Sequence, residues 1–424
     1  MLALLYVASA VAFIAVAAIL LVRRVHAVRK VRYQQYDTMM VKYGYLVDDM
    51  SKMTYQEAEE ISKYSSFLEM PWTVTVALSF ALFKTYAIPT ISSVLCKSGQ
   101  LSTEGSAGRR AEDTGIFINE FSGGGESHSV AGVDTERGSI ALARMNWLHS
   151  RYGNLIGRDD KLFTLALFVF EPFYFAEMMD YRPLNELEKE ARYVHWREIG
   201  ARMGIDDIPA TRAGLLEWTT AYGKKSMVYD PRNAQVGNAT FSVLLKDMPR
   251  FMWPLGKRMS LVLLDDHMLE AFGWKKPPAW MYWLVPRLLR IKGLVCGNLL
   301  FPRTTPPPHV KTSVRCAFAG PESEKGEKSE KEAPDAGQPQ IVRDGYIFEP
   351  FYVKPDGARM GALGLGKPGL PKYNPDGYTN SRLGPERLYH QGVDVTLKNA
   401  AAMRERAQGG KCPYFVAKEA VATS

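Results

Sequence analysis

The amino-acid sequence predicts an all-α protein with one N-terminal transmembrane helix. The chain opens with an apolar run that carries no charge, and its central segments repeat apolar residues at helical spacing. Nothing in it shows the alternating strands that a sheet needs. Apolar residues make up 46% and charged residues 23% of the chain, an ordinary globular mixture that excludes wholesale disorder.

Length, charge and cysteine content narrow the class further. The 424 residues allow two or three domains, or one large helical domain with tails. The 53 basic and 45 acidic residues leave a net charge of +8, which is too modest and uneven for a nucleic-acid-binding stripe. The cysteines at positions 96, 296, 316 and 412 lack zinc-ligand spacing and are too sparse for a disulfide scaffold, so we expect a reducing compartment.

Residues 1–22 are predicted to form a permanent membrane anchor. Residues 2–22 are 21 uncharged residues, enough to span a hydrocarbon core of ~30 Å. A cleaved signal peptide would have a basic first region and a shorter apolar stretch, whereas only Met1 precedes this run. Five basic residues follow the span directly, namely Arg23, Arg24, Arg29, Lys30 and Arg32. The positive-inside rule therefore places the bulk of the chain in the cytosol.

The segments that follow the anchor are expected to be helices joined by two loops. Residues 23–50 should leave the bilayer as a helix, residues 54–70 form the next one, and the apolar stretch 71–97 is either a buried helix or one that dips into the membrane. The Gly/Ser-rich segments 98–109 and 122–139 are expected to be loops, with a short helix at 113–121 between them.

The second half of the expected domain is a succession of helices. Helices are predicted at 139–152, at 160–179 with a kink or break at Pro172, and at 185–203 between an Asn185 cap and Gly204. Four more are expected at 212–227, 236–250, 254–272 and 280–300. The helical domain is thus assigned to 23–310, followed by a charged, disordered linker at 311–340. A Gly/Pro-rich tail at 341–424 could either pack against the domain or stay loose.

Several motifs are set aside. The glycines of 364–369 match a dinucleotide-binding string, but no strand precedes them and the prolines at 368 and 371 forbid a helix. Cys412 lacks the surroundings of a cytochrome P450 thiolate. The seven histidines are too scattered for a di-iron desaturase, and His195 with Glu198 is interpreted as structural. A solvated helix face explains Asp265-Asp266-His267 better than a metal site, and the Gly/Pro-rich setting of His390 makes it a poor ligand.

One constellation has the chemistry of a haem site. His149 lies in an expected helix among Trp147, Leu148 and Tyr152, a setting that suits a neutral axial ligand of haem iron. Arg110 and Thr114 precede it by about 35 residues and could hold a propionate or a distal oxygen species. A simply packed structural histidine is the alternative.

Around these residues the chain resembles a known family. The resemblance is to the fungal endoplasmic-reticulum-bound oxygenases of the MpaB type and the bacterial latex-clearing rubber oxygenases, and it is closer to the fungal members. It covers the anchor and six blocks in the right order: 81–95, 109–121 (RRAEDTGIFINEF), 143–153 (ARMNWLHSRYG), 161–177, 182–205 and 227–233.

The resemblance implies a fold, a cofactor and a set of site residues. It implies a globin-like, all-α catalytic domain with b-type haem that uses O₂ to cleave a carbon–carbon double bond of an isoprenoid chain. The family's axial histidine falls on His149, and its arginine and threonine near the haem fall on Arg110 and Thr114. Rubber oxygenases often carry a lysine where this chain has Asp113, a reversal of charge that implies a different substrate or distal network.

Together these features predict a membrane-anchored, haem-dependent oxygenase. Its expected substrate is a hydrophobic prenylated molecule such as a meroterpenoid, and its expected place is the endoplasmic reticulum membrane. Apolar helices at 161–179 and 72–83 could line a tunnel for the prenyl chain. The alternative is a catalytically inactive, membrane-anchored protein of the same fold that binds lipids or partners. Lys84, Glu112 and Asp113 remain open as candidate bases, and the oligomeric state remains open too.

Overall fold

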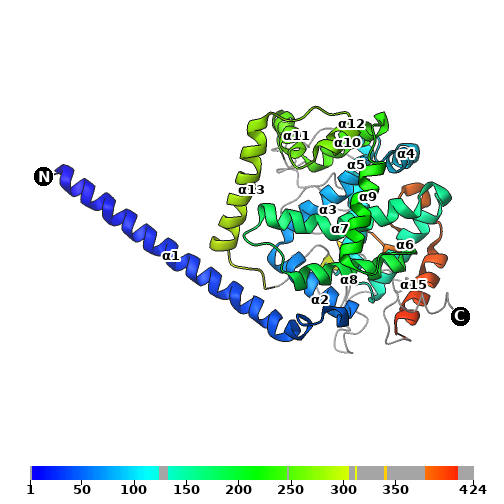
Figure 1. The fold of residues 1–424 in the computed structure, drawn as a ribbon, viewed down its shortest axis with the longest axis horizontal. Helices are drawn as coiled ribbons and strands as arrows, with labels where there is room; N and C mark the ends of the chain where they lie inside the picture. The colour runs from blue at the N-terminus through cyan, green and yellow to red at the C-terminus, as the bar shows by residue number, and fades with distance from the viewer. Residues whose placement is uncertain are drawn as a thin grey trace, which may run out of the picture.

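The computed structural model describes residues 2–123, 132–245, 248–304, 311–312, 339–340 and 378–408. Within these ranges one long helix extends away from a bundle of shorter helices (Figure 1). The described strands are β1 (Lys311–Thr312) and β2 (Pro339–Gln340), which pair antiparallel over two residues. The predicted all-α class is confirmed.

The long helix is α1 (Leu2–Tyr43), which continues the expected span and the basic segment after it without a break. It is long and apolar enough to cross a membrane. Apolar side chains such as Phe13 and Ile14 are 75% and 66% exposed, as expected of a helix whose partner is lipid. Its lower part turns to the bundle, where Met39 and Tyr43 are buried.

Helix α7 (Arg158–Met179) forms the centre of the bundle and packs against α3 (Pro71–Thr85), α8 (Glu186–Arg202) and α9 (Arg212–Ser226). Its length and composition would also suit a membrane span, but 78% of its most apolar stretch is buried inside the protein. Pro172 lies within α7, and the expected break is absent. Lys84 of α3 binds Glu171 of α7 at 2.7 Å, which ties the two helices together.

Local capping explains where several helices begin. The expected Asn185 cap is present, with reciprocal bonds between Asn185 and Glu188, and Gly204 follows the helix with a φ of +71°. A similar box at Thr54 starts α2 (Tyr55–Lys63), which continues as a π-helical turn, η3 (Tyr64–Glu69).

Three expected elements differ from the structure. The predicted loop at 98–109 is wrong in its second half, because Thr103 caps α5 (Glu104–Ser122). The stretch 71–97 is interrupted before Pro89, where α4 (Pro89–Ser98) begins. The predicted helix 254–272 consists of α11 (Trp253–Leu261) and α12 (Asp266–Phe272), because the Asp265 side chain caps the second. The remaining described helices are α6 (Glu136–Ser150), α10 (Pro231–Leu244), α13 (Ala279–Leu299) and α15 (Val393–Gln408), and short 3₁₀ turns join them.

Residues 378–408 fold back onto α6, so the described part of the tail packs rather than hanging loose. Arg144 of α6 is fully buried and donates to the carbonyls of Leu383, Leu388 and Gln391 at 2.9, 2.8 and 2.6 Å. Residues 313–338 and 341–377, which include most of the predicted linker and the glycine-rich string, lie outside the described residues, as does Cys412.

Replacing Arg144 with methionine should release this C-terminal segment. The variant keeps apolar bulk but leaves three carbonyl groups without their charged donor, so we expect a loss of about 2–4 kcal/mol in the free energy of unfolding. Denaturant titration in detergent measures the loss. Arg387→Met changes an exposed arginine of the same segment and should cost less than about 0.5 kcal/mol. Equal effects of the two substitutions would contradict the role assigned to Arg144.

Candidate active site

Arg110 and Thr114 lie one turn apart on α5 and bind each other. The Arg110 guanidinium donates to the Thr114 hydroxyl, and the hydroxyl donates to the Arg110 carbonyl oxygen at 2.8 Å. Both side chains are half-buried. The pair therefore presents a hydroxyl of fixed orientation beside a positive charge.

His149 lies in the last turn of α6, the helix that packs against α5. Desolvation, with the positive charges of Arg110 and Lys161, lowers the pKa of its imidazole to about 4. The ring is therefore neutral at physiological pH. Because the charge of Arg110 acts on this pKa, His149 lies within electrostatic range of Arg110, which binds Thr114.

Two further residues join this group that sequence reasoning missed. Lys161 comes from the start of α7, and Tyr86 follows the last residue of α3. Burial raises the pKa of Tyr86 to about 12 against the opposing charge of Arg110, so the phenol stays protonated. Neither residue belongs to a local motif with His149, and only the packing of α3 and α7 reveals them.

The residues next to His149 in the chain serve a different contact. Trp147 and Leu148, expected beside the imidazole, pack against the C-terminal segment. A Cβ at Gly392 would lie 2.0 Å from the Trp147 ring, and one at Gly384 would lie 2.9 Å from Leu148. These two glycines allow the segment to approach α6 closely. The described tail thus supports the helix that carries His149.

The residues present fit a haem group. An imidazole that ligates haem iron must be neutral, and the imidazole of His149 is neutral at physiological pH. Its ring makes no hydrogen bond to any residue that the structure describes, which leaves a nitrogen for iron. Haem also carries two propionates. Arg110 and Lys161, the two cations that lower the pKa of His149, are suitable partners for these propionates.

The candidate bases occupy different environments. Glu112 and Asp113 are 2% and 1% exposed, within the same turns of α5 as Arg110 and Thr114. The Lys84 ammonium lies between both carboxylate oxygens of Glu171, at 2.8 and 2.7 Å. Lys84 is thus engaged in an ion pair that joins α3 to α7. The two buried acids of α5, which share their helix with Arg110 and Thr114, are the better candidates.

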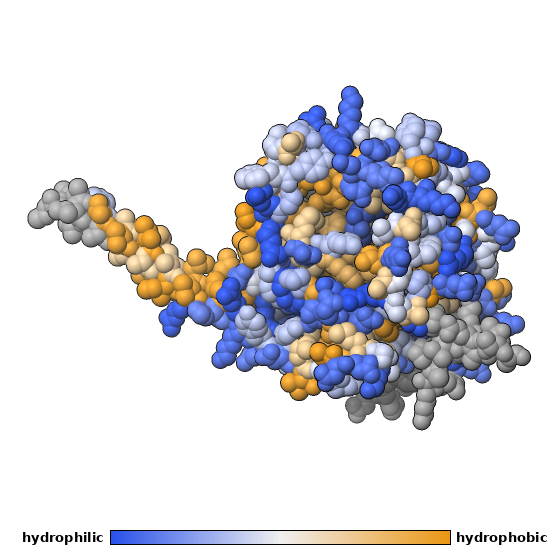
Figure 2. Space-filling model, viewed as in Figure 1, coloured by the Kyte–Doolittle hydropathy of each residue, from blue (hydrophilic) through white to orange (hydrophobic). Residues whose placement is uncertain are grey.

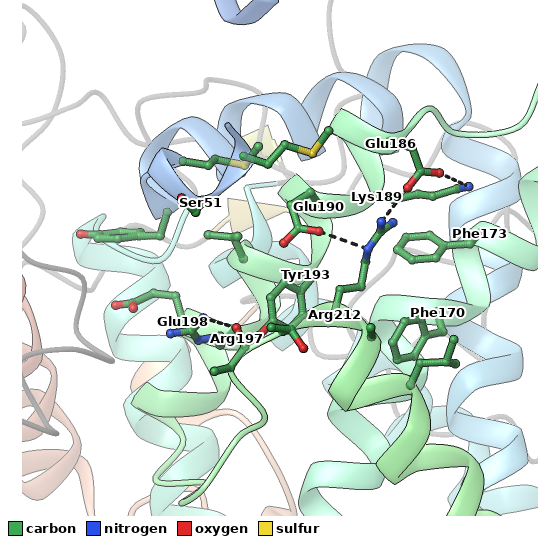
Figure 3. Close-up of a pocket in the computed structure, with 18 of the residues that line it drawn as sticks. Ser51, Phe170, Phe173, Glu186, Lys189, Glu190, Tyr193, Arg197, Glu198 and Arg212 are labelled. Atoms are coloured by element: carbon green, nitrogen blue, oxygen red, sulfur yellow. Dashed lines mark hydrogen bonds and ion pairs between the residues drawn. The ribbon is translucent and has the colours of Figure 1, made fainter. Parts of the chain in front are cut away.

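A cleft of about 800 Å³ is lined by residues of α7, α8 and α9 (Figure 3). Phe170, Phe173 and Tyr174 of α7 line it, whereas no lining residue comes from 72–83, α5 or α6. Arg212 binds Glu186 at 2.6 Å and Glu190 at 3.1 Å across the cleft. The cleft combines apolar and charged side chains, and it is lined by the predicted 161–179 helix but not by the helices that carry Arg110, Thr114 and His149.

His195 is buried among charged groups. It is 2% exposed, and its Nδ1 lies 4.0 Å from Glu59. Burial, reinforced by the charges of Lys63, Arg192 and Arg202, lowers its pKa to about 3. Within the described ranges no cluster of His, Cys, Asp and Glu could hold a metal ion.

Acid should destabilise the protein partly through His195. Its folded pKa of about 3 lies below an unfolded value of ~6.5, so the unfolded state takes up the proton first as the pH falls. Stability is therefore complete above ~pH 6.5 and declines below it, with His195 contributing about 2 kcal/mol of the loss by pH 5. His195→Gln should flatten the stability–pH curve between pH 7.5 and 5, measured by denaturant titration. The exposed His267→Gln should leave the curve unchanged, and an unflattened curve for His195→Gln would refute the assignment.

Comparisons with known proteins match the part of the chain that carries these residues. Residues 109–291, which contain Arg110, Thr114, His149 and Lys161, match the family model "ER-bound oxygenase mpaB/B'/Rubber oxygenase, catalytic domain". The chain is 29% identical to the ER-bound oxygenase mpaB' of Penicillium brevicompactum, covering 91% of each chain. It is 32% identical to the ER-bound oxygenase mpaB of Penicillium roqueforti, covering 58% of this chain and 85% of the relative.

Proposed function

Because the chain belongs to the family of the ER-bound oxygenases mpaB and the rubber oxygenases, we propose that it is a membrane-anchored, haem-dependent oxygenase that cleaves a C=C bond in the prenyl chain of a hydrophobic substrate. The observation that carries the proposal is the neutral His149 imidazole beside Arg110 and Lys161, within the matched catalytic domain. Cleavage consumes one O₂ and converts the alkene into two carbonyl groups, so atoms balance without another reductant.

Each residue of the group has a distinct task in this proposal. His149 would ligate the haem iron, and Arg110 with Lys161 would neutralise the propionates. Bound b-type haem supplies the activation of O₂. With substrate bound, the Thr114 hydroxyl would turn its proton from the Arg110 carbonyl oxygen towards the reacting oxygen while still accepting from the Arg110 guanidinium, and Glu112 or Asp113 would accept or return a proton nearby.

A membrane anchor would place the enzyme close to a substrate that dissolves in lipid. Two relatives are named ER-bound, and the helix α1 is apolar enough to cross a bilayer. We propose one span in the endoplasmic reticulum membrane, with the five basic residues after it holding the catalytic domain in the cytosol. A prenyl chain partitions into the bilayer with ~0.8 kcal/mol per buried CH₂, so the anchor places the enzyme where the substrate is concentrated.

Product analysis under ¹⁸O₂ tests the proposal. The purified chain, supplied with haem and a farnesylated phenol, should yield two carbonyl fragments that each carry one ¹⁸O. A product of unbroken carbon skeleton with one added oxygen would replace cleavage by hydroxylation. The absence of any O₂-dependent product would favour the second candidate, an inactive lipid- or partner-binding relative, which the acid at position 113 supports.

Thr114→Val should separate catalysis from cofactor binding. The variant keeps the shape of the side chain and loses the hydroxyl, so haem content should persist while turnover falls about 10- to 100-fold. Haem is measured as the pyridine complex and turnover by product formation. Thr220→Val removes a hydroxyl that binds the carbonyl four residues earlier on the exposed face of α9, and it should leave both quantities unchanged. Unaltered turnover in Thr114→Val would refute the catalytic role.

A further inference from the structure

Helix α13 has two apolar faces, and only one of them packs on protein. Met281, Val285, Gly293 and Gly297 form the buried face. The approach is close, because a Cβ at Gly293 would lie 2.3 Å from the carbonyl oxygen of Met179 at the end of α7. The packed face therefore fixes the orientation of α13 on the domain.

The opposite face is apolar and exposed. We call it the α13 stripe; its members are Trp280 (57% exposed), Trp283 (59%), Leu288 (46%), Ile291 (56%), Leu294 (42%) and Val295 (46%). They recur at helical spacing and therefore share one face of the helix, together with Arg287, which stacks on Trp283. A surface helix in water normally carries polar residues on that side, and an exposed apolar strip of this kind marks an interaction site.

The charges and aromatic residues of α13 favour a lipid surface. The helix contains Arg287, Arg290 and Lys292 and no carboxylate. Lys275 and Lys276 lie just before it. Two tryptophans at its start suit the boundary between headgroups and acyl chains, where indole rings concentrate. Basic residues beside an apolar face are attracted to anionic lipids.

The other end of α13 meets the membrane anchor. Arg24 donates to the carbonyl of Leu299 at 2.9 Å, and Arg29 donates to Asn298 at 2.8 Å. Leu300, which directly follows α13, is 54% exposed. Arg24 and Arg29 come just after the expected span, at the depth of the headgroups. These bonds therefore place the end of α13 at the same depth. Figure 1 shows α13 along the side of the domain that α1 approaches, and Figure 2 shows apolar residues continuing from α1 onto that edge.

We propose that the α13 stripe is a second membrane contact, which lies in the headgroup–acyl boundary of the leaflet next to the domain. This inference rests on the proposal that α1 crosses the membrane. With one helix crossing the bilayer and another lying along it, the domain is held at two places and cannot swing freely about α1. The catalytic domain then keeps a constant orientation towards a substrate dissolved in lipid.

Site-specific quenching in nanodiscs tests this contact on the full chain. The four native cysteines are replaced by serine, and a single cysteine labelled with a nitrobenzoxadiazole dye is introduced by Ile291→Cys, Ile19→Cys or Val395→Cys. All three native residues are apolar and similarly exposed. Ile291 lies on the α13 stripe (56% exposed), Ile19 lies in the span (58%), and Val395 lies on α15 (50%). The nanodiscs contain phosphatidylcholine and phosphatidylserine, with and without lipids that carry a nitroxide near the headgroup.

Three patterns of quenching are informative. Nitroxide lipid should quench the dye at 291 to an extent comparable with 19, and leave 395 unaffected. Quenching at 19 with none at 291 would overturn the α13 contact and leave the anchor intact, and this result is also expected if a second copy or another protein covers the stripe. No quenching at 19 would overturn the anchor and the α13 contact together, while haem content and turnover test the oxygenase proposal separately.

Discussion

His149→Ala should yield a folded protein that retains no haem. The substitution removes the neutral imidazole and leaves Arg110 and Lys161, whose charges would suit propionates but cannot replace a ligand to iron. We expect the Soret band of the wild-type protein to disappear after gel filtration, with the circular dichroism of the helices unchanged. The expected loss of O₂-dependent turnover is complete, because O₂ activation depends on the bound iron.

Two other histidines provide controls for this experiment. His267→Ala alters an exposed histidine and should keep the full haem content. His195 is the strongest rival ligand, because it is buried and its ring lacks a hydrogen-bond partner among the described residues. The His195→Gln variant should nevertheless keep its haem. Free imidazole should restore a Soret band to His149→Gly. A variant at 149 that binds haem as well as the wild type would refute the axial assignment.

Features with a local cause could be predicted from the sequence. The cap at Asn185 and the stop at Gly204 depend on hydrogen bonds and backbone angles within a few residues, and both are present. The spacing of Arg110 and Thr114 places them on one face of any helix, and the two bind each other as soon as α5 forms. The start of α5 is the exception, because Gly and Ser around residue 105 hid the Thr103 cap.

Features that depend on distant packing could not be predicted. The charge of Arg110 acts on Tyr86, and that of Lys161 acts on His149, because the fold brings together segments that belong to different helices. The role of Arg144 depends on carbonyl groups about 240 residues later in the chain. No periodicity or motif encodes such contacts, so the sequence places the site on its helices without showing what surrounds and supports it.

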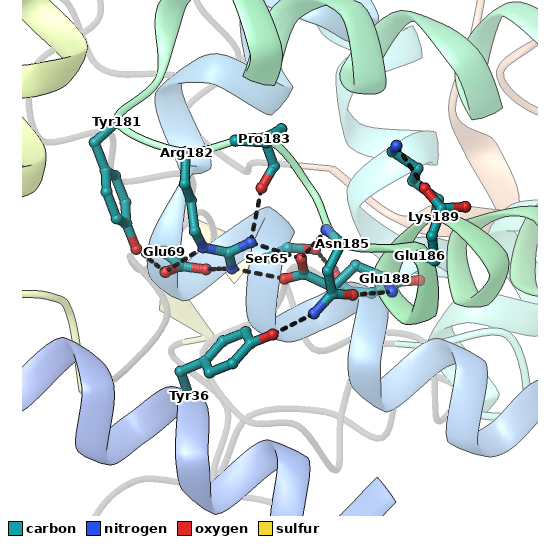
Figure 4. A network of polar contacts seen from close by, with 11 residues as sticks. Tyr36, Ser65, Glu69, Tyr181, Arg182, Pro183, Asn185, Glu186, Glu188 and Lys189 are labelled. Atoms are coloured by element: carbon teal, nitrogen blue, oxygen red, sulfur yellow. Dashed lines mark hydrogen bonds and ion pairs between the residues drawn. The ribbon is translucent and has the colours of Figure 1, made fainter. Parts of the chain in front are cut away.

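The largest expected loss of stability follows from replacing Arg182 with methionine. Arg182 binds Glu188 through two bonds of 2.7 and 2.8 Å and also binds Glu69 (Figure 4). The two carboxylate side chains are 0% and 3% exposed. Glu69 also accepts from Tyr181, and Glu188 caps α8, so the network joins η3 to the start of α8. Without the guanidinium two buried carboxylates lose their partner, which costs about 3–5 kcal/mol.

The pH dependence of this loss identifies its cause. Burial already raises the pKa of Glu69, and Arg182 opposes that rise. In Arg182→Met the folded pKa should move further above the unfolded value, so protonation stabilises the folded state and the loss should be smaller at pH 5 than at pH 7.5. Adding Glu69→Gln to the Arg182→Met variant should recover part of the lost free energy of unfolding. Arg212→Met breaks the more exposed pairs with Glu186 and Glu190 and should cost about 1 kcal/mol or less. If the losses at 182 and 212 were equal, or that at 182 did not change with pH, buried charge would not be the reason for the stability of this network.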